Sequence, residues 1–127
     1  GTAWKSISDE KYKTIIETKE DIHGLDLVEL LHPIKYQWNK KYIEKYGEND
    51  EVLYGFTAQN VQEVIPEMVN EDSEGDLWYS PSGFEAILTS AIQEQQSQIE
   101  QLQSENESLK ERIEALELAI GQILAQG

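Results

Sequence analysis

The last third of the chain, residues 88–123, carries apolar residues in a heptad pattern. One set recurs every seven residues and a second set follows it three residues later, so the mean period is 3.5. This period predicts a long helix whose apolar seam is covered by partner helices. The alternative is a single amphipathic helix lying on its own domain, but such a helix normally carries a wider apolar face. The a positions are Ile92, Ile99, Asn106, Ile113 and Ile120, and the d positions are Leu88, Gln95, Leu102, Leu109, Leu116 and Ile123.

Charged residues beside the seam indicate that the partner helices run parallel. In a parallel coil in register, a residue at g contacts the residue at e five positions later on the neighbouring helix. Glu105 then meets Lys110, and Arg112 meets Glu117, so both pairs join opposite charges. The heptads therefore predict a parallel homo-oligomer.

Two polar residues interrupt this seam. Asn106 and Gln95 would contact their own copies, and a buried polar residue in a seam fixes the register at a cost in stability. Ile at a with Leu at d favours two strands. The heptads alone therefore leave the choice between a dimer and a trimer open.

Shorter elements are predicted before the coil. Apolar residues at helical spacing followed by proline predict helices, and alternating apolar and polar residues predict strands. The predicted helices cover residues 24–31 and 58–65, and the predicted strands cover 34–38, 52–57 and 77–79. Residues 40–51 are polar and contain a predicted turn at 47–50, with no helix or strand assigned, and residues 70–76 are predicted as an acidic loop. Pro81 is expected near the first turn of the final helix, with Ser80 as its cap.

These elements predict an α+β fold that is mainly α. The expected organisation is a lead-in over residues 1–7 with one large apolar residue, Trp4, a small globular domain over 8–80, and a long C-terminal helix and coiled coil over 81–127. A domain of roughly 80 residues forms a core that is marginal alone. We therefore expect oligomerisation to supply part of the missing burial.

Composition excludes several classes of protein. The 127 residues include no cysteine, which excludes disulfides and thiolate zinc sites. No apolar run approaches the ~20 residues that a membrane helix needs, and no signal peptide begins the chain. The net charge is −15, of which −14 falls in residues 41–127, and this argues against binding to nucleic acid or anionic lipid. The chain lacks an initiator Met, so we expect a fragment or a processed product.

Most of the candidate chemical motifs are expected to be structural. His23 and His32 are too few and too isolated for a metal site, so no metal or other cofactor is predicted. Residues 72–76, Asp-Ser-Glu-Gly-Asp, lack the spacing of a calcium loop and are expected to form a solvated turn. The aromatic residues of the predicted strands offer a sugar-binding platform, with core packing as the default interpretation; they are Tyr36, Trp38, Trp78 and Tyr79.

One short cluster, residues 8–13, combines a hydroxyl and an amine. Ser8 and Lys13 are five residues apart, and such a pair can form a serine nucleophile with a lysine general base. Ser near Lys is a common combination, so from these residues alone capping of a helix or turn by Ser8 or Asp9 is the default interpretation, since acidic residues follow in the first turn.

The order of three motifs resembles a known family. Residues 8–13, SDEKYK, are similar to an S-D-x-R-x-K start, and residues 30–38, LLHPIKYQW, to an L-x-P-V-x-Y-x-W segment. Residues 54–69, YGFTAQNVQEVIPEMV, are similar to a G-F-x-A-Q-x-V-x-x-x-x-P-E-x-V segment, the most specific of the three. The chain thus resembles the C-terminal intramolecular chaperone domain of phage tailspikes and tail fibres, the chaperone-of-endosialidase or S74 peptidase family.

The resemblance implies a homotrimer that aligns three copies of a covalently attached N-terminal fibrous passenger and then cuts itself off. Cleavage would fall before Ser8, at the Ile7–Ser8 peptide bond, with Lys13 completing a Ser-Lys dyad and residues 1–7 ending the passenger. Asp9, Glu10 and Lys11 are possible supporting residues, and Lys11 stands where the family has Arg. The implied location is the host cytoplasm during virion assembly, followed by release from the mature fibre.

Elementary chemistry links such cleavage to assembly. A lysine in water has a pKa of about 10.4 and acts as a base near neutral pH only if that value falls to about 7–8. Such a shift corresponds to roughly 4 kcal/mol of desolvation or like-charge repulsion. A flexible start of a small domain cannot provide this, whereas a pocket closed by neighbouring subunits can.

Two other functions compete with this interpretation. A non-catalytic trimerisation clamp would use the same fold and stay attached to the fibre, and a glycan-binding fibre tip would need exposed aromatic residues. Residues 1–7 precede Ser8 in the present chain, which fits an uncleaved precursor, conditional cleavage or a cut elsewhere. The identity of the passenger and any ligand that regulates release are not encoded in these motifs.

Overall fold

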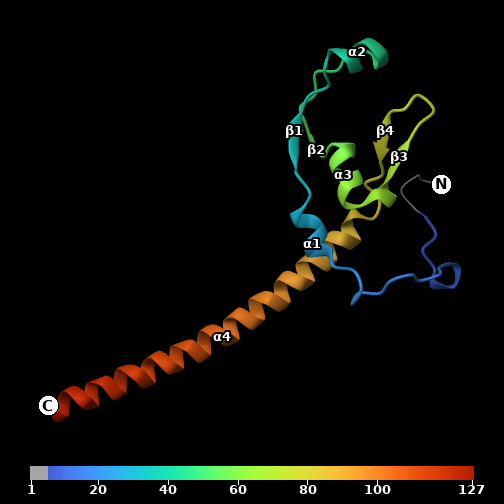
Figure 1. Cartoon of the computed structure of the whole chain (residues 1–127). Helices are drawn as coiled ribbons and strands as arrows, with labels where there is room; N and C mark the ends of the chain where they lie inside the picture. Colours follow the sequence, from blue (N-terminus) through green and yellow to red (C-terminus); the bar gives the residue numbers. More distant parts are fainter. Residues whose placement is uncertain (1–5) are drawn as a thin grey trace.

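The computed structural model describes residues 6–127, so Trp4 and most of the predicted lead-in lie outside the described residues. A small globular part sits at one end and a single long helix extends from it (Figure 1). The elements, in chain order, are η1 (Glu10–Tyr12), α1 (Gly24–Glu29), β1 (Ile34–Tyr36), α2 (Lys40–Tyr46), β2 (Leu53–Gly55), α3 (Ala58–Val64), η2 (Pro66–Met68), β3 (Val69–Glu71), β4 (Leu77–Tyr79) and α4 (Phe84–Gln126). This arrangement confirms the predicted α+β fold, mainly helical, with a long C-terminal helix.

The strands form two separate antiparallel pairs. β1 pairs with β2, with Ile34 opposite Gly55, and β3 pairs with β4, with Val69 opposite Tyr79. A two-stranded ribbon is marginally stable alone and needs an apolar partner. α3 supplies one by packing against β3 and β4.

The core of the single chain is small. Among the described residues, the buried apolar side chains are Val61 and Ile65 at α3, Leu25 and Leu31 at α1, and Ala91 on α4. Val61 is the one that is fully buried, at 0% exposure. So limited a core agrees with the marginal stability expected for the isolated domain.

The heptad seam of α4 is uncovered within one chain. α1 packs across the first turns of α4, where Ser90 and Ala91 are buried. The apolar seam residues lie on another face and range from 47% exposed at Ile99 to 67% exposed at Ile123. The amphipathic-helix alternative therefore accounts for the start of α4 only, and its remaining length projects away from the domain (Figure 1).

Two segments contain regular structure that was not predicted: the polar segment 40–51 holds a helix, and the loop prediction for 70–76 was wrong at its start. α2 occupies residues 40–46, where the Asn39 side chain caps it by accepting a hydrogen bond from the Tyr42 N–H at 3.1 Å. Gly47, with φ of 101°, ends the helix. β3 occupies the start of the predicted acidic loop, and the hairpin to β4 turns at Gly75, with φ of 84°.

The predicted start of the final helix was also wrong. α4 begins at Phe84, after Gly83 with φ of 100°, rather than at Pro81. Pro81 instead belongs to a turn, and its carbonyl accepts a hydrogen bond from the Phe84 N–H at 3.2 Å. Ser80 accepts from the Ser82 N–H at 3.3 Å and so caps this turn rather than the helix.

Candidate functional site

The candidate dyad lies on an N-terminal strap, residues 6–23, outside the globular part. Every residue from 6 to 21 is exposed, and the strap meets α4 near its C-terminal end, where Lys19 lies beside Ser90 and Glu94 just before α1. In Figure 1 the strap is the dark-blue to blue segment that runs beside the globular part. The strap is thus held at its C-terminal end within a single chain.

One turn of 3₁₀ helix brings the two dyad residues together. The Asp9 side chain caps η1 by accepting a hydrogen bond from the Lys11 N–H at 3.0 Å, and the Lys13 N–H closes the turn on the Glu10 carbonyl at 3.0 Å. The chain reverses enough for the Lys13 Nζ to donate to the Ser8 Oγ at 2.6 Å. Asp9 therefore caps the turn, and the Ser8 hydroxyl accepts a hydrogen bond from Lys13 rather than acting as the cap.

The neighbouring charged residues take other positions. The Lys11 Nζ lies 5.2 Å from the centre of the Tyr12 ring, a cation–π distance, and Glu10 is exposed in the first turn. Ile7, on the other side of the predicted cleavage point, is 78% exposed. The Ile7–Ser8 peptide bond is therefore accessible in the single chain.

The single chain supplies the geometry of a Ser-Lys pair without its burial. Both Ser8 and Lys13 are exposed. A lysine acts as a base only in its neutral form, and removal from water is the usual way to favour that form. Burial of this pair would have to come from outside the chain that carries it.

Large apolar side chains surround the pair on the strap. They are Ile7, Tyr12, Ile15 and Ile16, and their exposed fractions run from 62% at Ile15 to 91% at Ile16. Several large apolar residues exposed on one short segment are typical of a surface that another molecule covers. The part of the strap that carries the dyad is therefore suited to burial against a partner.

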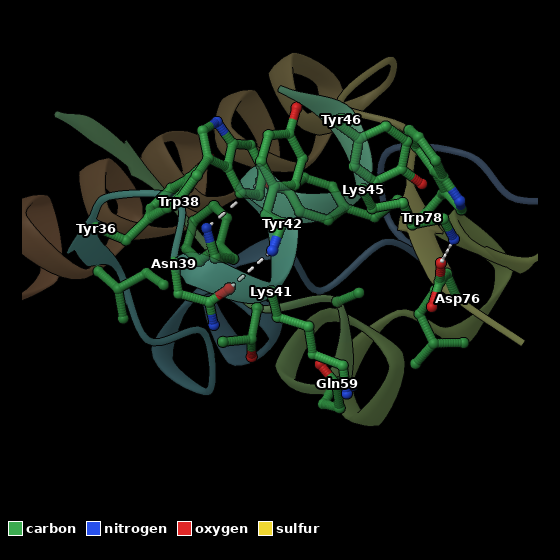
Figure 2. Close-up of a pocket in the computed structure, with 16 residues that line it drawn as sticks. Tyr36, Trp38, Asn39, Lys41, Tyr42, Lys45, Tyr46, Gln59, Asp76 and Trp78 are labelled. Carbon is green, nitrogen blue, oxygen red and sulfur yellow. Dashed lines mark hydrogen bonds and ion pairs between the residues drawn. The ribbon is translucent and has the colours of Figure 1, made fainter. Parts of the chain in front are cut away.

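A second feature is an open aromatic cleft of about 860 Å³ between the β1–α2 arm and the β3–β4 hairpin (Figure 2). Trp38 and Tyr42 stack with their ring centres 4.0 Å apart, and Tyr42 and Tyr46 follow at 4.8 Å. Their spacing of four residues is a helical signal. The strand predicted over residues 34–38 included Trp38, so the helix that follows it was not predicted.

Ion pairs and hydrogen bonds hold the rim of this cleft. Lys45 of α2 pairs with Glu74 and, at 2.9 Å, with Asp76 of the hairpin, and the hydrogen bonds to these carboxylates raise the pKa of Lys45 above its usual range. Trp78 is 57% exposed, and its indole N–H donates to Asp72 at 2.7 Å. Burial of both Trp38 and Trp78 would have argued against a glycan-binding site. Trp38 is partly buried but Trp78 is exposed, so that argument does not apply.

The loop at 72–76 forms a turn organised by one carboxylate. Asp72 accepts hydrogen bonds from the Glu74 N–H at 2.9 Å, the Asp76 N–H at 3.0 Å and the Trp78 indole. Throughout residues 6–127, no group of three or more His, Asp or Glu side chains is arranged to hold a metal ion. The same residues contain no helix of sufficient length and apolar character to cross a membrane.

Fold and site together define a small α+β domain with an exposed Ser-Lys pair at its start and an unpaired heptad helix at its end. Comparison with known families makes the class specific: the family model described as "Chaperone of endosialidase" (Peptidase_S74) matches residues 8–70. The chain belongs to this family, and membership implies an intramolecular chaperone with a self-cleaving role.

A curated viral relative also matches. It is the uncharacterized protein VP1 of Micromonas pusilla reovirus (isolate Netherlands/2005), 35% identical over 65 residues. The match covers 51% of this chain but only 3% of that protein, so it concerns one small module of a much longer relative.

Proposed function

We propose that this chain trimerises and aligns an N-terminal fibrous passenger and then releases it by cleaving the Ile7–Ser8 peptide bond. The observation that carries this proposal is the hydrogen bond of 2.6 Å between the Lys13 Nζ and the Ser8 Oγ. The pair lies directly at the bond where the family's cleavage would fall, and no cofactor is needed for the reaction.

The reaction proceeds through an ester. Neutral Lys13 takes the proton of the Ser8 hydroxyl while Oγ attacks the Ile7 carbonyl carbon. The bond between that carbon and the Ser8 nitrogen then breaks, and the nitrogen leaves as an amine that receives the proton from Lys13. Water next hydrolyses the ester, which leaves a carboxylate on Ile7 and restores the Ser8 hydroxyl. Each chain reacts once, in cis.

Assembly gates this reaction. The uncovered seam of α4 and the exposed apolar residues of the strap both call for partners, and the paired e and g charges favour copies that run parallel. The number three comes from the family resemblance. Neighbouring subunits would cover the strap and remove the dyad from water, so that cleavage follows formation of the trimer.

The passenger is a viral fibre or spike. The family resemblance indicates phage tailspikes and tail fibres in particular, and the similarity to a reovirus protein supports a viral origin. Folding, assembly and cleavage would take place in the host cytoplasm, before the chaperone leaves the mature fibre.

Two alternatives are each favoured by one observation. The exposure of Ser8 and Lys13 in the single chain favours a non-catalytic trimerisation clamp that stays attached. The exposed Trp78 at the rim of the aromatic cleft favours a glycan-binding fibre tip. Neither alternative accounts for the contact between Ser8 and Lys13.

The test is mass spectrometry of the chain fused to its natural upstream segment. A product that begins at Ser8 and accumulates with time is expected, and Ser8→Ala or Lys13→Met should abolish it. Ser6→Ala, which removes an exposed hydroxyl two residues away, is the matched control and should cleave like the parent. A parent that stays intact when fully assembled, or a Ser8→Ala variant that still cuts, would contradict the proposal.

A further inference from the structure

A buried hydroxyl on α4 holds the end of the strap. The Ser90 Oγ accepts a hydrogen bond from the Gly24 N–H at 3.0 Å and donates one to the Ile22 carbonyl at 2.8 Å. Ser90 is only 8% exposed, and among residues 6–127 it is the one polar side chain that is buried. Glu94, one turn later, accepts from the Leu25 N–H at 3.3 Å. These hydrogen bonds tie the strap and α1 to the final helix.

Close backbone packing reinforces this attachment. A Cβ built on Gly24 would lie 2.3 Å from the Ile87 carbonyl oxygen and 2.7 Å from the Ala91 nitrogen. Both atoms belong to the backbone of α4, so a side chain at this position cannot be accommodated by rotation. Gly24 therefore allows two backbones to touch where the strap ends.

The attachment lies outside the heptad seam. With Ile92 at a, Ser90 falls at f and Glu94 at c, whereas the seam residues beside them, Leu88 and Ile92, are 48% and 64% exposed. The strap can thus stay attached to each helix while the seams of several helices meet. Its position around the axis of the coil is then fixed by Ser90.

Within the described residues, the strap makes no hydrogen bond to the domain before Ile22, although Lys19 lies beside Ser90 and Glu94 of α4. Residues 6–21 are all exposed, and the hydrogen bonds that they make join them to one another or to Ile22. The direction in which the strap leaves α4 therefore depends on the Gly24–Ser90 contact.

We propose that Ser90 is a positioning residue for self-cleavage: it fixes the strap to the outer face of α4, so that assembly of the helices delivers each dyad to its neighbouring subunit. This inference rests on the proposed function. Ser90 does not touch the reacting atoms and acts only through the strap. Its loss should slow cleavage within the assembled oligomer and leave the seam intact.

The first experiment measures the cleavage rate of the assembled full chain with its upstream segment. Ser90→Ala should be slower than the parent by about tenfold or more, because a small misplacement of a reacting group has large effects on rate. Ser90→Cys, which keeps a weak donor and acceptor, should recover part of the loss. Ser104→Ala is the matched control, since Ser104 also falls at f and is exposed, and it should cleave like the parent.

Loss of stability is separated from loss of position by Val61→Ala, which weakens the core at α3 and removes none of the hydrogen bonds of Ser90. The two variants are compared at conditions that give the same fraction of folded and assembled chain. Under these conditions the cleavage rate of Ser90→Ala should be lower than that of Val61→Ala. Equal rates would overturn the proposal, because Ser90 would then act through stability alone.

The second experiment does not depend on cleavage. In a Ser8→Ala background, amide hydrogen exchange of residues 8–24 in the oligomer should rise in Ser90→Ala and stay unchanged in Ser104→Ala. If the parent does not cut, but exchange in the strap still rises in Ser90→Ala, the proposed function is refuted. The role of Ser90 in attaching the strap to α4 is then still supported. Unchanged exchange in Ser90→Ala would overturn this inference, whatever the parent does.

Discussion

The Lys13 Nζ donates a hydrogen bond to the Ser8 Oγ at 2.6 Å across one turn of 3₁₀ helix. Both residues lie on the exposed strap, so the local sequence brings them together without help from the core. Asp9 sets the turn by accepting the Lys11 N–H at 3.0 Å.

Asp9→Ala should therefore slow cleavage without changing the oligomer. Loss of a capping side chain costs about 1 kcal/mol, which corresponds to roughly a fivefold fall in the ratio of closed to open turn. Asp9→Asn should cleave almost like the parent, since Asn caps as well as Asp. The cleaved fraction against time decides the matter, and equal slowing by both substitutions would show that the charge of Asp9, rather than its cap, is what cleavage requires.

Ile16→Ser tests whether a neighbour covers the strap. Ile16 is 91% exposed in the single chain, so this substitution should leave the monomeric fold intact. If a neighbouring subunit buries Ile16, each subunit loses about 1.5–3 kcal/mol of apolar burial and cleavage slows about tenfold or more. Thr14→Ala, at an exposed position of the same strap, is the control. A rate equal to the parent's would show that this part of the strap stays in solvent.

Asp72 makes the β3–β4 hairpin sensitive to acid. The Trp78 indole N–H, followed by the backbone N–H groups of Asp76 and Glu74, holds the pKa of the Asp72 carboxyl below its usual range. A lowered pKa in the folded state stabilises the hairpin above the unfolded value of about 3.9, and this stabilisation is lost as the pH falls through the folded value. The Trp78 indole proton signal in NMR spectra should shift with a midpoint below about pH 3.9 in the parent.

Asp72→Asn supplies the control for that titration. It removes the ionisable group, so the Trp78 indole signal should no longer shift over the acid range. The hairpin should also be less stable than the parent's at neutral pH, and the difference should shrink on acidification. A signal that still titrates in Asp72→Asn would assign the effect to another carboxylate.

Asn106→Ile should raise the melting temperature of the oligomer and loosen its alignment. Asn106 lies at an a position, where a buried polar side chain costs stability but fixes the register. Misaligned subunits would present the dyads poorly, so cleavage should slow in spite of greater stability. Melting temperature, oligomer mass and cleaved fraction are measured on the same samples. A variant that is more stable, has an unchanged mass and cleaves as fast would show that Asn106 does not set the register here.

The repetitive parts of the fold were predictable from the sequence. The heptads predicted α4 because apolar residues that recur every three to four positions over such a length are typical of a long helix. Gly24 marked the start of α1, and Pro33 and Pro66 limited how far α1 and α3 could extend. α2 was missed because Trp38, Tyr42 and Tyr46 stack along one side of a short polar segment whose charges suggest a loop. β3 was missed because its residues acquire their partner only through the turn held by Asp72.

The candidate site was predictable in part. The five-residue spacing of Ser8 and Lys13 allowed a dyad but favoured capping, and the family resemblance assigned the two residues to cleavage. The structure adds the cap by Asp9 that brings them into contact. The attachment by Ser90 was not predictable from the sequence, because Gly24 and Ser90 are 66 residues apart and no pattern pairs them. Only the packing of α1 across α4 brings them together.

The central claim is that assembly gates self-cleavage, and a dilution series tests it most directly. The full chain with its upstream segment is held at several concentrations, and the oligomer mass by light scattering and the fraction of product beginning at Ser8 are followed together. The account predicts that the rate of cleavage falls in proportion to the trimer fraction and is constant per assembled chain. Monomer that cuts at the same rate as trimer, or fully formed trimer that yields no such product, would contradict it.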